Sequence, residues 1–197
     1  MKDLWQELQD LEWAEYLKSP VGTFSVDGLR GAEMTGHVIN DTIPGGRCLD
    51  VGCGVLPFPS YMKAAPDVCF MGIDPYTEKV KREFKFFRGY AENLPWATEV
   101  FDGVLFATSL DHVKDPSVAL KESYRVLSKG GYLFIWCSVR KNDKKYQQWL
   151  KAPKPARYDT FHMWAYTEKS LMELAKDFNF VERIIVKGNE SIFIFRK

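Results

Sequence analysis

From Arg47 onward the sequence alternates between short apolar runs and amphipathic stretches, and this alternation limits the folds that the chain can adopt. The stretches predicted as helices are PSYMKAA, TEKVKREF, PSVALKESYRVLSKGG and TEKSLMELAKDF. The runs predicted as strands are RCLDVG, VCFMGID, FKFFRG, FDGVLFATS, YLFIWCSV and the two halves of VERIIVKGNESIFIFRK. Strands that alternate with helices predict a parallel sheet with right-handed crossovers and helices on both faces.

Proline, glycine and capping residues predict where individual elements begin and end. Pro116 opens a helix that we expect to end at Gly130-Gly131, because proline favours the first helical position and glycine the position after the last turn. Thr167 is the expected cap of a later helix. Gly188-Asn189 predicts a hairpin turn between the last two strands, which adds an antiparallel edge to the sheet.

The N-terminal part is predicted to be helical. Residues 3–18 place apolar side chains near helical spacing, and Ser19-Pro20 ends the pattern. A second helix is expected from about Leu29 to Ile43, with Asp27 as a candidate N-cap. The predicted fold is therefore α/β: a Rossmann-like, doubly wound, mostly parallel seven-stranded sheet with an antiparallel C-terminal hairpin and an N-terminal helical cap. We expect one domain over 1–197, consisting of the cap (1–45), the alternating core (46–137), an insert (138–166), and a C-terminal helix and hairpin (167–197).

Composition limits the class of protein. The chain has 197 residues, of which 46% are hydrophobic, enough for one domain with a sizeable core. A formal net charge of +1 argues against a protein built to bind the phosphates of nucleic acid. No apolar run approaches the ~20 residues of a membrane span, and the N-terminus lacks the apolar region of a signal peptide. Cys48, Cys69 and Cys137 are expected to be buried free thiols, which suits a reducing cytoplasm.

Two glycines, Gly52 and Gly54, directly follow the first strand of the alternating region. Glycine there lets the backbone bend sharply and approach a ligand closely, and ligands of such sheets lie at the carboxyl ends of the strands. Asp74 ends the next strand, where a carboxylate can accept hydrogen bonds from both hydroxyls of a ribose. A dinucleotide and S-adenosylmethionine both fit this arrangement. Pro57 stands at the third small position of the dinucleotide fingerprint and argues against the dinucleotide.

Residues 88–136 carry a longer and more specific pattern. They contain AENLPW, FDGV, LDHVKDP and E-x-x-R-V-L-x-x-G-G in that order. Together with LDVGCG at 49–54 and GIDP at 72–75, this segment resembles the class I S-adenosylmethionine-dependent methyltransferases that act on small molecules. The resemblance covers about residues 47–137, and it implies that 46–137 is a cofactor-binding core for S-adenosylmethionine.

The resemblance also implies roles for individual residues. The cofactor ligands that it implies are Asp50, Gly52 and Gly54 around the methionyl group, Asp74 at the ribose, Ala91 and Glu92 at the adenine, and Ala107, Thr108 and Ser109 beneath the sulfonium. Two departures from the family pattern stand out. Tyr90 occupies a position where the family often has an aspartate that touches the adenine. Val55 and Leu56 stand where the family often has another glycine, so they narrow the expected pocket.

Asp111, His112 and His162 are the candidate catalytic residues on the acceptor side. Asp111 and His112 follow the fourth strand, and His162 lies in FHMWAYT, which resembles stretches in methyltransferases of cell-surface polysaccharide and related pathways. An alcohol that accepts a methyl group benefits from a general base. Loop capping by Asp111 and His112, and a buried hydrogen-bonded role for His162, remain alternatives. The three histidines of the chain are dispersed without zinc-ligand spacing, so no metal is expected.

A basic segment, residues 140–158, follows the fifth strand and is expected to border the mouth of the active site. Its cations are Arg140, Lys141, Lys144, Lys145, Lys151, Lys154 and Arg157, against the single acid Asp143. Tyr146, Trp149 and Tyr158 are interleaved with these charges. The segment is interpreted either as a lid for an anionic acceptor, such as a phosphorylated or carboxylated sugar or a lipid carrier at a membrane surface, or as a solvated loop and helix.

The sequence as a whole predicts a cytoplasmic methyltransferase that uses S-adenosylmethionine on a small-molecule or glycan-like acceptor, with oxygen as the favoured atom. One rival is a catalytically silent module that keeps the fold and acts through a partner, which Tyr90 motivates. A second rival is a nicotinamide-dependent oxidoreductase, against which Pro57 argues. Nucleic acid is not expected as a partner, and the oligomeric state is left open.

Overall fold

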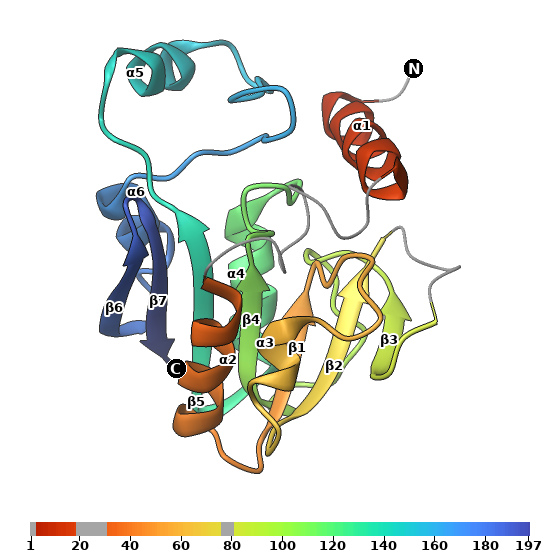
Figure 1. Cartoon of the computed structure of the whole chain (residues 1–197). Coiled ribbons are helices and arrows are strands. Elements are labelled where there is room, and N and C mark those ends of the chain that lie inside the picture. The colour runs from red at the N-terminus through yellow and green to blue at the C-terminus, as the bar shows by residue number, and fades with distance from the viewer. Residues whose placement is uncertain (1–2, 19–30, 76–80) are drawn as a thin grey trace.

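The computed structural model describes residues 3–18, 31–75 and 81–197, and its central feature is one sheet with the strand order β3-β2-β1-β4-β5-β7-β6 (Figure 1). Its strands are β1 (Arg47–Val51), β2 (Cys69–Asp74), β3 (Lys85–Arg88), β4 (Phe101–Ala107), β5 (Leu127–Ser138), β6 (Asn179–Lys187) and β7 (Glu190–Arg196). Its helices are α1 (Leu4–Lys18), α2 (Gly31–Thr42), α3 (Ser60–Lys63), α4 (Pro116–Val126), α5 (Lys144–Lys151) and α6 (Glu168–Leu174).

The strand pairing confirms the predicted fold. β1 pairs in parallel with both β2 and β4, and β3 and β5 extend the parallel sheet on either side. β7 runs antiparallel between β5 and β6, so the hairpin at Gly188-Asn189 closes one edge. The direction of winding changes between β1 and β4. Ligands of such sheets bind beside the carboxyl ends of the strands at this switch point.

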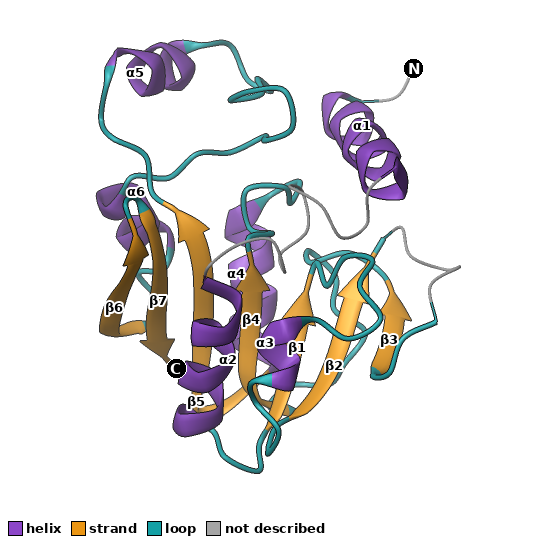
Figure 2. Cartoon of the chain, in the orientation of Figure 1, coloured by secondary structure: helices purple, strands orange, loops and turns teal. Residues whose placement is uncertain are grey.

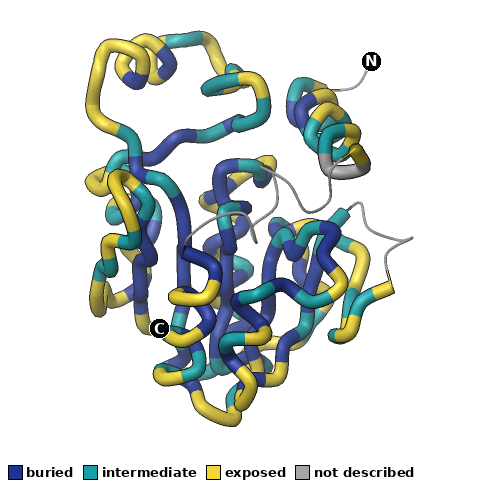
Figure 3. Tube along the Cα trace, viewed as in Figure 1, coloured by how far each residue is buried: buried dark blue, intermediate teal, exposed yellow. Residues whose placement is uncertain are grey.

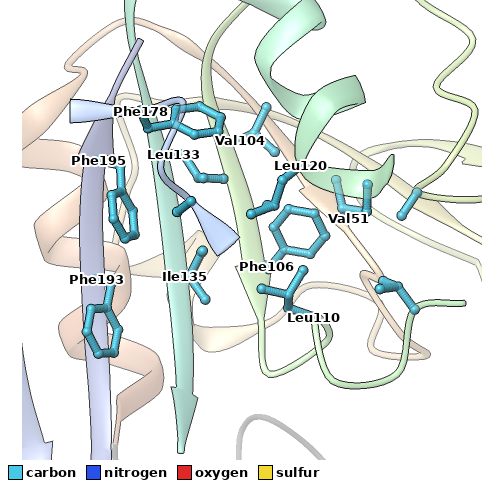
Figure 4. Close-up of a cluster of buried hydrophobic side chains, with 14 of the residues drawn as sticks. Val51, Val104, Phe106, Leu110, Leu120, Leu133, Ile135, Phe178, Phe193 and Phe195 are labelled. Carbon is cyan, nitrogen blue, oxygen red and sulfur yellow. The ribbon is translucent and has the colours of Figure 1, made fainter. Parts of the chain in front are cut away.

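Helices cover both faces of the sheet, with α2 and α3 on one face and α4 and α6 on the other (Figure 2). Side chains along β5 alternate between the two resulting cores. Leu133 and Ile135 pack with Leu120 of α4 in one cluster, shown in Figure 4. Phe134 and Trp136 pack in the other, against α2 and α3. All four β5 residues are fully buried, as expected for strands covered on both faces, and Figure 3 shows the same burial along the central strands.

The helix that begins at Pro116 ends earlier than predicted. α4 stops at Val126, and Leu127 already has extended backbone angles and pairs with Phe101 of β4. Gly130 and Gly131 therefore lie within β5 and do not end the helix, and that prediction is wrong. Pairing with β4 resumes at Tyr132 after a shift in register, so the positive φ of Gly130 serves an irregularity in the strand.

Several other expectations change or cannot be followed. The helix predicted over 77–84 is not seen at residues 81–84, while 76–80 lie outside the described residues. Ser19-Pro20 and the candidate cap Asp27 also lie outside them. Cys69 begins β2 and is exposed, so its expected burial is wrong, whereas Cys48 and Cys137 are buried free thiols as predicted. Thr167 caps α6 with a reciprocal bond to Ser170, as predicted.

Two helices, α1 and α5, lie beyond the carboxyl ends of the parallel strands, on the side where ligands of such sheets bind (Figure 1). The second N-terminal helix, α2, packs instead against α3 on one face of the sheet. Within the described residues, no helix has the length and apolarity needed to cross a membrane.

Candidate active site

The turn after β1 has the geometry of a ligand cradle. Gly52 and Gly54 have φ angles of +78° and +64°, in the left-handed region that favours glycine. A Cβ atom added to Gly52 would lie 2.5 Å from Cβ of Ser109, so a side chain is excluded there by packing. A Cβ atom added to Gly54 would meet no atom of the described residues within 4 Å, and Gly54 lines an open pocket. Gly52 is therefore required by the protein interior, and Gly54 leaves space for a ligand.

Asp74 helps to hold this turn. The backbone N–H of Gly54 donates to Oδ2 of Asp74 at 3.1 Å, and the N–H of Gly52 donates to the carbonyl of Ile73 at 2.8 Å. On the other side, the Arg82 guanidinium donates to the Gly54 carbonyl at 2.5 Å. The end of β2 thus fixes the end of β1, and the Asp74 carboxylate lies at the pocket wall.

The pocket at this crevice is open to solvent, and its empty volume, including that open space, is about 930 Å³. Its lining comes from the ends of β1, β2 and β4, from the segment 89–92, from 112–113, and from α1. The lining residues are Trp5, Gln9, Glu12, Trp13, Val51, Gly52, Cys53, Gly54, Val55, Leu56, Ile73, Asp74, Pro75, Gly89, Tyr90, Ala91, Glu92, Ala107, Thr108, Ser109, His112 and Val113. A sulfonium cofactor fits this pocket, because the cradle at Gly54 is open and a carboxylate stands one strand away.

Most residues that the sequence assigned to the cofactor line this pocket. They are Gly52, Gly54, Asp74, Ala91, Glu92, Ala107, Thr108 and Ser109. Thr108 has a φ of +57°, a strained angle for a residue with a side chain, at the end of β4. Such strain is concentrated at functional sites and agrees with the position of Thr108 on the pocket wall.

Asp50 is placed differently from the other predicted cofactor residues. It is absent from the described pocket lining and fully buried, and its Oδ2 accepts a 2.6 Å hydrogen bond from the Tyr61 hydroxyl of α3. Burial raises the pKa of Asp50 to about 7, since this effect outweighs the hydrogen bond from Tyr61, which lowers it. Its predicted contact with the methionyl group stays untested.

Helix α1 contributes residues that the sequence reasoning missed. Trp5, Gln9, Glu12 and Trp13 all line the pocket. Trp5 Nε1 donates to the His112 carbonyl at 2.8 Å, and Gln9 Nε2 donates to the same oxygen at 3.2 Å. An amphipathic pattern predicts the helix but does not say which distant loop it will contact. These contacts place α1 over the loop that follows β4.

The three candidate catalytic residues come together, although they belong to two distant segments. Nε2 of His112 lies 3.7 Å from Oδ1 of Asp111, and Nε2 of His162 lies 3.7 Å from Oδ2 of the same carboxylate. The two imidazole rings have centroids 4.7 Å apart. Asp111 is buried, and His112 also lines the cofactor pocket, so the cluster adjoins that pocket. The argument that the histidines are dispersed is wrong for two of them, whereas His37 is exposed on α2.

Two further carboxylates lie beside the Nδ1 atoms of the two imidazoles, on the sides that face away from Asp111. Nδ1 of His112 lies 2.8 Å from Glu12 of α1, and Nδ1 of His162 lies 2.7 Å from Asp159. Burial by itself would lower the pKa of His112, but the charges of Glu12 and Asp111 raise it to about 9. Burial by itself would raise the pKa of Asp159, but the hydrogen bond and charge of His162 and the backbone N–H groups of Phe161 and His162 together lower it. No sequence signal pointed to Glu12 as a partner of His112, and Asp159 could be found only from its spacing to His162.

Backbone hydrogen bonds set the position of the His162 segment. The N–H of Trp164 donates to the Asp111 carbonyl at 3.1 Å, and its indole Nε1 donates to the Val113 carbonyl at 2.8 Å. The Tyr166 hydroxyl donates to the Leu110 carbonyl at 3.0 Å. The loop after β4 and the segment before α6 are thus joined edge to edge, which explains why Asp111 faces His162.

The basic segment 140–158 does not line the cofactor pocket. Tyr146 and Trp149 of α5 are buried with Ala165, so this helix is anchored to the His162 segment. Arg140 and Lys145 lie over the Tyr158 ring at 5.4 and 4.2 Å from its centroid. Most of the remaining cations are exposed, as Figure 3 shows around α5.

Comparison with known proteins agrees with the fold and the pocket. A family model described as a methyltransferase domain matches residues 36–182. The chain is 29% identical over 157 residues to an uncharacterized protein of Methanocaldococcus jannaschii. This match covers 77% of this chain and 71% of that protein. It is 33% identical over 98 residues to the demethylmenaquinone methyltransferase of Renibacterium salmoninarum. This match covers 47% of this chain and 41% of that protein. The chain thus spans less than half the length of the second relative.

A solved structure, a SAM-dependent methyltransferase of Thermotoga maritima, has the same fold with a TM-score of 0.66 and 23% identity, covering 94% of this chain and 98% of that one. Sheet order, glycine turn and pocket define a class I S-adenosylmethionine-dependent methyltransferase. The chain belongs to the methyltransferase domain family, because the family model matches most of its length. The resemblance drawn from the motifs is therefore confirmed, and the nicotinamide alternative is set aside.

Proposed function

We propose that this enzyme transfers the methyl group of S-adenosylmethionine to a hydroxyl oxygen of a small-molecule or glycan-like, anionic acceptor. The observation that carries this proposal is the cluster of Asp111, His112 and His162 beside the cofactor pocket. A buried carboxylate between two imidazoles is a place where an acceptor hydroxyl can bind and give up its proton.

The pocket residues would hold the cofactor, which supplies an activated methyl group when bound. The open turn at Gly54 would accommodate the methionyl group, and Asp74 would accept hydrogen bonds from the ribose. Ala91 and Glu92 line the end of the pocket where adenine would lie. Trp5 and Trp13 of α1 would exclude water from it. This arrangement positions the reactants, which is a large part of catalysis when the cofactor carries the reactive carbon.

The acceptor would enter on the side of the cluster. Its oxygen would form a bond to the methyl carbon as the carbon–sulfur bond breaks with its electrons left on sulfur, and the cluster would pass the hydroxyl proton to water. The demethylmenaquinone relative bears a name that indicates a quinone precursor as its acceptor. For this chain, His162 and its carboxylate partner Asp159 support an oxygen acceptor instead.

The basic segment 140–158 supports an anionic acceptor. Its helix α5 is anchored through Tyr146, Trp149 and Ala165 to the segment that carries His162. Exposed cations on the same segment, among them Lys141 and Lys144, would attract a carboxylate or phosphate at a distance. The same surface would allow contact with an anionic membrane surface.

Binding and turnover measurements test this proposal separately. Calorimetry with S-adenosylmethionine should show binding by the natural chain and none by Asp74→Ala, with Asp67→Ala as an exposed acidic control. His162→Ala should lower turnover about 100-fold or more with unchanged cofactor affinity, as expected for loss of proton-transfer assistance. His37→Ala is the matched control. Equal cofactor affinity in Asp74→Ala would refute the ribose assignment.

A catalytically silent module is the second candidate. Tyr90 lies on the pocket wall and makes an edge contact with Trp5, with ring centroids 5.8 Å apart. This pair occupies the region where the family often places an adenine-binding aspartate. A chain that binds the cofactor but transfers no methyl group to any hydroxylated acceptor would support this candidate over the enzyme.

A further inference from the structure

We infer that Asp111, His112 and His162 bind one divalent transition-metal ion, and that open coordination positions on this ion receive the acceptor oxygen. The acceptor half of this inference rests on the proposed function, whereas the metal site itself rests only on geometry. One ligand atom from each of the three residues lies within 4.8 Å of the others. The inference reverses the prediction from sequence that no metal is bound.

The donor set is the first argument. Two imidazole nitrogens and one carboxylate form the combination that binds Zn²⁺, Fe²⁺ and related ions while leaving coordination positions open. Ligand atoms at roughly 2.0–2.2 Å from a common ion are separated by about 3–4 Å. The separations of 3.7 Å between the Asp111 oxygens and each Nε2 atom already match this spacing. An ion could thus enter with small side-chain movements.

The groups behind the imidazoles are the second argument. Metal-binding histidines usually donate their other ring N–H to a carboxylate, which fixes the ring and makes the free nitrogen a better ligand. Here each histidine has a carboxylate beside Nδ1: Glu12 lies 2.8 Å from Nδ1 of His112, and Asp159 lies 2.7 Å from Nδ1 of His162. Asp159 is itself held by the backbone N–H groups of Phe161 and His162. Both Nε2 atoms are therefore turned toward Asp111.

The third argument is a buried oxygen that accepts no hydrogen bond from the described residues. Among the residues that the structure describes, no donor reaches Oδ1 of Asp111 within hydrogen-bonding distance, although this atom is buried. A buried polar atom without a partner is costly and calls for an explanation such as an unseen ion. Three carboxylates, Glu12, Asp111 and Asp159, surround two imidazoles in this small space. A divalent cation would balance that charge and satisfy the oxygen.

The position of the site indicates how a bound ion would act on the acceptor. His112 lines the cofactor pocket, so an ion held by its Nε2 would lie beside the space where the methyl group is presented. A divalent ion lowers the pKa of an oxygen that binds to it and orients that oxygen. The ion would thus bring the acceptor hydroxyl into line with the methyl group and ease loss of its proton.

Zinc titration of the chelator-treated protein, without cofactor, tests the site. All variants carry Cys69→Ser so that the exposed thiol does not compete. One Zn²⁺ should bind per chain, and His162→Ala and Asp111→Asn should each weaken binding about 100-fold or more. Asp159→Asn should weaken it about 10–100-fold, the usual effect of losing such a supporting carboxylate. His37→Ala should bind as the parent does.

Thermal melting shows which variants are folded. Zn²⁺ should raise the melting temperature of the parent and of His37→Ala, because a ligand that binds the folded state stabilises it, and should leave His162→Ala unchanged. Equal zinc affinity in the parent and in His162→Ala would overturn the metal site, and a turnover rate unaffected by metal removal would overturn the role of the ion toward the acceptor. Cofactor binding without zinc binding rejects the metal site alone, whereas zinc binding without cofactor binding rejects the proposed function alone.

Discussion

The cofactor pocket adjoins the cluster of Asp111, His112 and His162, which we call the acceptor cluster. The two are assembled in different ways. The bond that ties Gly54 to Asp74 joins residues 20 positions apart, within one strand–helix–strand unit. The bond that ties Trp5 of α1 to the carbonyl of His112 joins residues 107 positions apart. The glycine cradle of the cofactor pocket is thus built by local backbone geometry, whereas the α1 wall of that pocket and the acceptor side are brought together only by tertiary packing. Local sites leave a motif in the sequence, whereas assembled sites do not.

The largest expected effect tests whether the glycine turn belongs to the protein interior. Gly52→Ala should lower the free energy of unfolding by about 3 kcal/mol, because left-handed strain adds to a clash with Ser109. Gly45→Ala is the matched control, since Gly45 has a similar φ of +74° and, in the part of the chain that the structure describes, no atom within 4 Å of its Cβ position. It should cost only about 1 kcal/mol. Equal losses in chemical denaturation would contradict the packing argument.

The next effect concerns Asp50. This residue is fully buried beside Tyr61, outside both the described pocket lining and the acceptor cluster. Its pKa rises from 3.8 to about 7 in the folded protein, chiefly through burial. Between these values the folded state keeps a proton that the unfolded chain has lost, so the contribution of Asp50 to stability is greatest at low pH and falls as pH rises. Asp50→Asn should remove this trend.

Melting curves of both proteins between about pH 5 and 8 measure the Asp50 effect. The stability of Asp50→Asn relative to the natural chain should increase with pH, on the order of 2 kcal/mol over this window. The amide keeps an oxygen that can accept the hydrogen bond from Tyr61. A difference that is constant with pH would show that Asp50 is already ionised in the folded protein.

A smaller effect distinguishes a ligand cradle from a simple turn. Gly54→Ala places a methyl group in the pocket and should weaken S-adenosylmethionine binding about tenfold, roughly 1.4 kcal/mol. Gly188→Ala is the control, because Gly188 has a φ of +58° and an equally open Cβ position at the distant hairpin. Both variants should lose similar stability, and calorimetry should show that only Gly54→Ala loses cofactor affinity. Unchanged affinity would place the cofactor elsewhere.

The smallest expected effect lies on the acceptor side. Trp164→Phe removes the indole N–H that bonds to the Val113 carbonyl and should cost about 1 kcal/mol of stability. We expect turnover to fall more than cofactor affinity, because Trp164 positions the segment that carries His162. Steady-state kinetics and calorimetry on the same preparation measure the two quantities. A loss of cofactor affinity with normal turnover would reverse the assignment of the two regions.

The sequence by itself determined the order of the strands and of most helices, the glycine turn, and the position of Asp74 at the end of β2, because these depend on local periodicity and on backbone angles open to glycine. It misjudged the end of α4, because pairing of Leu127 with Phe101 outweighs the local preference of Gly130-Gly131 to end a helix. Strand pairing is a long-range contact, and residue spacing alone does not reveal it.

Only the tertiary structure decided the composition of the acceptor cluster. Asp111 and His162 were each noticed, but their encounter depends on bonds from Trp164 and Tyr166 to the loop after β4. Glu12 joins them because α1 docks on that same loop through Trp5. The physical reason is that side chains from distant segments meet through packing of whole elements, and the chemistry of a buried group depends on which charges end up facing it.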